Sequence, residues 1–115
     1  MAIRTFAAID VGSFELEMGI YEMSYKTGIR RVDHIRHVIA LGKDTYSGGK
    51  ISYGLVEEMC QVLGEFAQIM KAYRVKDYRA YATSAMREAR NNQIILDQIR
   101  VRTGLTVRII SNSEQ

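Results

Sequence analysis

The sequence has 115 residues, a length typical of one globular domain or one lobe of a larger protein. Of these residues 47% are apolar and 25% are charged, and this composition excludes a disordered or fibrous chain. A formal charge of +3, from 16 basic and 13 acidic side chains without a dense basic run, argues against a nucleic-acid partner. No apolar run is long enough to cross a membrane or to act as a secretory signal, and the single cysteine, Cys60, predicts a buried structural thiol in a cytoplasmic protein.

Three strands joined by short turns are predicted in the first third of the chain. Residues 3–10 are an apolar run typical of a buried strand, and apolar side chains alternate with polar ones over residues 14–25. The turn sequence at residues 26–28 separates this strand from a third one over residues 29–41. We therefore expect an antiparallel meander. Three glycines among polar residues then predict a loop over residues 42–51.

A long helix is the clearest element of the sequence, over residues 52–74. Ser52 can cap its first turn, and Gly64 in its interior suggests close packing against another backbone. The apolar side chains that recur at spacings of four and three define the face we expect to be buried: Leu55, Met59, Val62, Phe66, Ile69 and Tyr73.

The last third of the chain alternates strands and helices. A short strand over residues 77–82 precedes helix-capping residues at 83–90. Asn91 or Asn92 is then expected to cap a second helix that runs to about Thr103. Gly104 follows as a helix stop, and residues 105–110 are predicted to be a strand. Helical connections between strands favour parallel pairing. The predicted fold is an α/β, five-stranded mixed sheet in the order β-β-β-α-β-α-β, which is that of a ribonuclease H-like lobe of the actin-like ATPase superfamily.

The first candidate site is the end of the first strand, residues 6–13, FAAIDVGS. Asp10 would be held rigidly at the strand end, where it can bind a metal ion or a water molecule. Gly12 lets the backbone approach a ligand, and Ser13 adds a hydroxyl donor for phosphate oxygens. An ordinary β-turn is the alternative interpretation of this segment.

The second candidate site is residues 81–91, YATSAMREARN, which follow a predicted strand and open a predicted helix. Thr83 and Ser84 supply hydroxyl donors, and the guanidinium of Arg87 is suited to phosphate. A helix cap with a surface arginine is the alternative.

Together the two segments resemble the Ppx/GppA family of exopolyphosphatases and guanosine-pentaphosphate phosphohydrolases. The family opens with a D-x-G-S-N-S turn, continues with A-T-x-A-x-R-x-A-x-N, and has an I-I-S-G-x-E-E segment that residues 109–115, IISNSEQ, resemble. The resemblance covers essentially the whole chain. It implies that Asp10, Gly12 and Ser13 form the first phosphate turn, that Arg87 contacts the phosphate under attack, that Mg²⁺ is the cofactor, and that polyphosphate or guanosine pentaphosphate is the substrate.

The chain departs from the family pattern at two positions. Phe14 stands where the family has Asn, and an apolar ring cannot donate a hydrogen bond to phosphate. Gln115 aligns with the family's catalytic base, although a slip of one residue would place Glu114 there. The family's second phosphate loop is absent from the sequence. We therefore expect residues 1–115 to be an N-terminal lobe without its second lobe, inactive by itself and prone to self-association.

Two other functions remain as alternatives: a non-catalytic regulatory relative that binds a phosphorylated nucleotide, and an actin-like ATPase or sugar-kinase lobe. Other polar pairs fit a structural role better. His34 and His37 are expected on opposite faces of a strand, which makes a shared metal site improbable. Glu15 and Glu17 share a strand face that is expected to meet solvent rather than to act as a catalytic pair.

Overall fold

A five-stranded mixed sheet organises the computed structural model, which describes residues 3–111. Strand order across the sheet is β3-β2-β1-β4-β5. The elements follow along the chain as β1 Arg4–Val11, β2 Glu15–Ser24, β3 Gly28–Val38, α1 Leu41–Gly48, α2 Tyr53–Ala72, β4 Asp77–Ala82, α3 Ser84–Glu88, α4 Asn92–Thr103 and β5 Arg108–Ile109. The first three strands pair antiparallel, whereas β1 with β4 and β4 with β5 pair parallel, as the sequence predicts.

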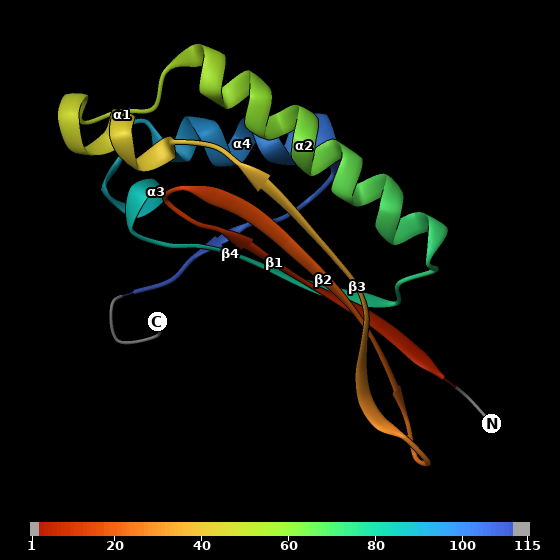
Figure 1. Ribbon diagram of the computed structural model, residues 1–115. Helices are drawn as coiled ribbons and strands as arrows, with labels where there is room; N and C mark the ends of the chain where they lie inside the picture. The colour runs from red at the N-terminus through yellow and green to blue at the C-terminus, as the bar shows by residue number, and fades with distance from the viewer. Residues whose placement is uncertain (1–2, 112–115) are drawn as a thin grey trace.

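The helices gather over one face of the sheet (Figure 1). Helices α2 and α4 pack against each other above the strands, and α1 and α3 lie at the end where β1 and β4 finish. Alternation along the strands explains the asymmetry, because alternate side chains such as Ile9 and Met18 turn into the core while Asp10 and Glu17 turn away. Among residues 3–111 no helix covers the second face.

The predicted loop over residues 42–51 is wrong, because most of it forms α1. Leu41 and Thr45 are one helical turn apart and are both buried, and the Thr45 hydroxyl donates to the carbonyl of Ala85 over 2.8 Å. The glycines that predict a loop instead mark the end of this helix, where Gly49 adopts a left-handed φ of 79°. The helix therefore exists because it docks on α3, which local composition does not reveal.

The helix predicted over residues 52–74 is present as α2, with the Ser52 hydroxyl accepting a hydrogen bond from the amide of Leu55. Its buried face is rotated relative to the prediction, since Tyr73 is exposed and Leu55 and Ile69 are half-buried. The core side of α2 consists of Val56, Met59, Cys60, Val62, Leu63, Phe66 and Met70. Burial raises the pKa of the Cys60 thiol, in agreement with a structural role.

Close backbone packing does not explain Gly64. A Cβ at this position would lie 3.8 Å from the Thr103 Cγ2, which is an ordinary van der Waals contact with a side chain. The expectation of close packing at Gly64 is therefore wrong.

The end of the chain is less regular than the sequence suggests. Within the predicted strand over residues 105–110, only Arg108–Ile109 pairs as β5, although Leu105 and Val107 are buried as the alternation requires. Helix α4 ends at Gly104 with a left-handed φ of 78°, as expected. None of the helices in residues 3–111 is long and apolar enough to cross a membrane.

Candidate functional site

The two candidate segments meet at one edge of the sheet. Asp10 is paired with Tyr81 and Val11 with Ala82 in the parallel register of β1 and β4, so that both strands end side by side. The amide of Thr83 continues this pairing by donating to the carbonyl of Val11 over 3.2 Å. The turn after β1 and the start of α3 are therefore neighbours, although about 70 residues separate them in the chain.

Three hydroxyl groups converge where the segments meet. The Ser13 Oγ lies 3.3 Å from the Ser84 Oγ and 3.2 Å from the Tyr46 Oη, and the Tyr46 Oη lies 2.5 Å from the Ser84 Oγ. We call Ser13, Tyr46 and Ser84 the hydroxyl cluster. Ser13 and Ser84 are both predicted from the sequence, whereas Tyr46 is not, because the segment that carries it is predicted to be a loop.

The backbone of the turn between β1 and β2 is held by a hydrogen bond within the turn itself. The Gly12 amide donates to the carbonyl of Glu15 over 3.0 Å, and a Cβ on Gly12 would come within 3.2 Å of the same oxygen. A side chain at Gly12 would therefore crowd this tight turn. Phe14 follows with its side chain 63% exposed, so the residue that replaces the family's Asn is directed to solvent.

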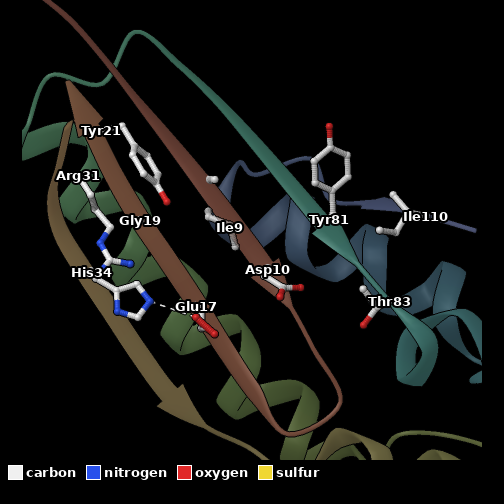
Figure 2. Close-up of a pocket in the computed structure, with 11 residues that line it drawn as sticks. Ile9, Asp10, Glu17, Gly19, Tyr21, Arg31, His34, Tyr81, Thr83 and Ile110 are labelled. Carbon is white, nitrogen blue, oxygen red and sulfur yellow. Dashed lines mark hydrogen bonds and ion pairs between the residues drawn. The ribbon is translucent and has the colours of Figure 1, made fainter. Parts of the chain in front are cut away.

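A cleft of about 480 Å³ lies on the uncovered face of the sheet beside this edge. Figure 2 shows Asp10 and Thr83 close to its end, with Glu17 on the neighbouring strand and Tyr81 on the opposite side of Asp10. Asp10 and Glu17 are directly opposite each other in the antiparallel register. Ser13, Ser84 and Arg87 do not line this cleft, so the predicted residues divide between the cleft and the hydroxyl cluster.

The surroundings of Asp10 disfavour the charged form of its carboxyl group. Partial desolvation beside the neighbouring strands raises the pKa of Asp10 above its ordinary value, although the residue is exposed by surface area, and the nearby carboxylates of Glu17 and Glu15 raise it further. These two glutamates are bonded to basic partners on β3: Glu17 to His34 over 3.1 Å and Glu15 to Arg36 over 2.5 Å. Glu17 is therefore a neighbour of Asp10 on the uncovered face of the sheet, and it alternates with buried Leu16 and Met18 as the sequence predicts.

The two histidines contact different elements. His34 faces the cleft through its bond with Glu17, whereas the His37 Nε2 lies 2.7 Å from a carboxylate oxygen of Glu58 on α2, above the covered face. This confirms that the histidines lie on opposite faces of β3. Within residues 3–111, no group of three or more His, Cys, Asp or Glu side chains is arranged to hold a metal ion.

Arg87 is directed towards the end of β5. Its Nη1 donates to the carbonyl of Ile110 over 2.8 Å, and its side chain is 23% exposed. Arg87 thus connects α3 with the segment that leads to residues 111–115. The predicted base positions, Glu114 and Gln115, lie outside the described residues.

Asp10→Asn is expected to stabilise the chain at neutral pH. An acid whose pKa is raised by folding destabilises the folded state when it is charged, so the amide removes a penalty that is present above the unfolded pKa of about 4. The gain in melting temperature should be present at pH 7 and should vanish as the pH falls below that unfolded pKa. Asp97→Asn, at an exposed position on α4, is the control and should give no such gain. An equal melting temperature for Asp10→Asn and the parent at pH 7 would contradict this prediction.

Comparisons with known proteins find similar sequences in one family. A sequence model described as the Ppx/GppA phosphatase family matches residues 20–115. Exopolyphosphatase 1 of Mycobacterium leprae is 27% identical over 108 residues, which are 93% of this chain and 32% of that protein. Exopolyphosphatase 1 of Mycobacterium tuberculosis H37Rv is 24% identical over 107 residues, 93% of this chain and 31% of that protein.

The fold is shared with a solved structure of the same family. The crystal structure of the Aquifex aeolicus Ppx/GppA family member superposes with a TM-score of 0.94 at 26% identity, covering 98% of this chain and 37% of that one. The strand order and this match confirm the predicted ribonuclease H-like lobe of actin-like type. The chain spans about a third of the length of these relatives. On the evidence of the family match and the shared fold, the chain belongs to the Ppx/GppA phosphatase family.

Proposed function

We propose that this chain is the N-terminal lobe of a phosphohydrolase, in which it forms the phosphate-binding half of the active site. The observation that carries the proposal is the meeting of the Ser13 and Ser84 hydroxyls where the ends of β1 and β4 lie side by side. The proposed reaction is attack of water on the terminal phosphoryl group of polyphosphate or guanosine pentaphosphate. A cytoplasmic location, which the single free thiol of Cys60 favours, belongs to the same proposal.

The roles of the residues follow from their chemistry. Ser13, Ser84 and Thr83 donate hydrogen bonds to phosphate oxygens, and Gly12 keeps the first turn tight enough for Ser13 to reach them. Arg87 supplies positive charge for the phosphoryl group under attack. Positioned donors of this kind favour the transition state, because they require no rearrangement as charge develops on the phosphoryl oxygens.

The residues of the cleft are compatible with Mg²⁺. This ion needs only one or two protein carboxylates, with water and phosphate oxygens completing its coordination, so a cluster of three protein ligands is not required. Asp10 would hold it, and the like charges that raise the pKa of Asp10 would favour a cation beside it. When bound, the ion would neutralise charge on the phosphate oxygens.

The chain of 115 residues by itself is proposed to be inactive. With one lobe, donors reach the transferring group from one side only, and the site is not closed to water. The aligned base position is Gln115, and general-base assistance is worth about 10²–10⁴ in rate. Gln115→Glu in this chain is therefore not expected to restore phosphate release, since the other two deficits remain.

Arg87→Ala is expected to weaken binding of pyrophosphate by about 10-fold or more, the effect of losing a hydrogen bond to a charged group. Calorimetric titration of the 115-residue chain measures the affinity. Arg100→Ala, which removes an exposed guanidinium on α4, is the matched control and should bind as the parent does. Because Arg87 also bonds to Ile110, thermal unfolding of the variant must show a folded protein.

Two results would count against the proposal. Equal affinity of the parent and Arg87→Ala for pyrophosphate would remove Arg87 from the site. Phosphate release from polyphosphate by the purified chain, lost in Arg87→Ala, would show that one lobe suffices and would overturn the proposed inactivity of this chain.

A non-catalytic relative that binds a phosphorylated nucleotide is the second candidate. Phe14 favours it, because this exposed ring replaces a hydrogen-bonding side chain of the family pattern at the phosphate turn. Binding of guanosine pentaphosphate without turnover by the longer protein would support this function, whereas phosphate release would exclude it.

Self-association is expected from the uncovered face of the sheet. Phe6 and Tyr21, both half-buried, stack there with their ring centroids 5.3 Å apart, and apolar surface that no other element covers tends to become covered by association. Light scattering at a protein concentration of about 100 μM, where exposed apolar surfaces usually cause association, should show oligomers. A clean monomer at that concentration would contradict the expectation.

A further inference from the structure

We infer that the hydroxyl group of Tyr46 is a third donor to the phosphoryl oxyanion bound between Ser13 and Ser84. The inference deepens the proposed function and rests on it, since it assumes that the hydroxyl cluster receives phosphate. It concerns a residue outside both sequence segments that indicate phosphate binding.

Three separate parts of the fold deliver the cluster. Ser13 comes from the turn between β1 and β2, Tyr46 from α1, and Ser84 from the first position of α3. The three oxygens form a triangle with sides of 2.5, 3.2 and 3.3 Å. Side chains that converge from three segments at this spacing can each reach an oxygen of one tetrahedral group.

The position of Tyr46 is fixed by Gly42, one helical turn earlier. The Gly42 amide donates to the carbonyl of Ser13 over 2.8 Å, which docks the start of α1 on the first turn. A Cβ at Gly42 would come within 3.0 Å of both the Ser13 Cβ and the Tyr46 Cε2. Because Gly42 lacks a Cβ, the Tyr46 ring can lie against Ser13. The docking of α1 on the first turn therefore brings the two hydroxyls together.

The local chemistry favours an anion at the cluster. Each hydroxyl can donate one hydrogen bond, and a phenol donates more strongly than an alcohol. Asp44, the one acidic residue of α1, is turned away and accepts a hydrogen bond from the Ser52 amide over 2.7 Å. The Tyr46 side chain is 55% exposed, so a ligand can reach its hydroxyl without displacing core residues.

Tyr46→Phe isolates the hydroxyl, because the ring that packs beside Ser13 is kept. We expect the affinity of the 115-residue chain for inorganic tripolyphosphate, measured by calorimetry with phosphorus NMR for millimolar binding, to fall about 10-fold, as for one hydrogen bond to a charged group. Tyr53→Phe, at a 79% exposed tyrosine at the start of α2, is the matched control and should leave the affinity unchanged.

A double-mutant cycle separates direct donation from an indirect effect through Ser84. If the Tyr46 hydroxyl contacts the ligand, Tyr46→Phe weakens binding in the Ser84→Ala background as well as in the parent. If Tyr46 only orients Ser84, its replacement has no effect once the Ser84 hydroxyl is gone, and the inference is overturned.

The outcomes also distinguish this inference from the function on which it rests. Binding that Arg87→Ala weakens and Tyr46→Phe does not would leave the phosphate half-site standing and remove Tyr46 from it. Absence of tripolyphosphate binding by the parent chain at millimolar ligand would overturn both.

Discussion

Phe66→Ala is expected to lower the free energy of unfolding by about 3–5 kcal/mol, the usual cost of truncating a buried phenylalanine. Phe66 lies on the core side of α2 with 2% of its surface exposed, and it is the largest of the fully buried side chains. Truncation would leave a cavity between α2 and the sheet. Domains of this size have a total stability of about 5–15 kcal/mol, so the loss is a large fraction of it.

Urea denaturation followed by circular dichroism measures this effect. Gln68→Ala, two residues further along α2 and exposed, serves as the control and should change the unfolding free energy by about 0.5 kcal/mol or less. A loss below about 1 kcal/mol for Phe66→Ala would mean that α2 does not pack on the sheet as described.

Asn91→Ala is expected to cost about 2–4 kcal/mol, because it leaves two backbone groups without their partners. The Asn91 Oδ1 accepts from the Ile51 amide over 3.2 Å, and the Asn91 Nδ2 donates to the Ile51 carbonyl over 2.9 Å. Ile51 is 2% exposed, so water replaces these bonds poorly. With the bond from the Arg90 amide to the Gly49 carbonyl, Asn91 joins the loop before α2 to the loop before α4.

Comparison with two other variants tests this account. Asn91→Asp keeps the acceptor for the Ile51 amide and loses the donor, so it should fall between Asn91→Ala and the parent in unfolding free energy. Gln93→Ala, at an exposed position in the first turn of α4, should have little effect. Equal stability of Asn91→Ala and Gln93→Ala would show that the pairing with Ile51 contributes nothing.

The role of Asn91 shows how far sequence reasoning reaches. Its place in the family-like segment is evident from the sequence, and the prediction that a helix starts at this point is confirmed, since α4 begins at Asn92 with Asn91 at the N-cap position. Its side chain makes no cap and bonds to Ile51 instead. Local propensity identifies where a helix starts, but the partner of a side chain depends on which loop the tertiary fold brings beside it.

The sheet was predictable because its signal is local. Alternation of apolar residues sets the buried face of β1 and β2, and element order sets the parallel pairing of β1 with β4. Helix α1 and its Tyr46 were missed since Thr45 is stabilised by Ala85, 40 residues away. The bond from Arg87 to Ile110 is not evident from the sequence either, because a long flexible side chain can reach several acceptors and the tertiary fold decides which ones lie near it.

The two partners of β1 in the sheet are synthesised at different times. Its antiparallel partner β2 follows at once, but its parallel partner arrives late, since Phe6 pairs with Asp77 and 71 positions separate them. A ribosome adding about 5–20 residues per second needs about 4–14 s to cover that distance. Throughout this interval the strand that carries Asp10 has an open edge in the nascent chain, with backbone groups that another strand could pair with. The central strand of the finished sheet is therefore an edge strand of the growing one.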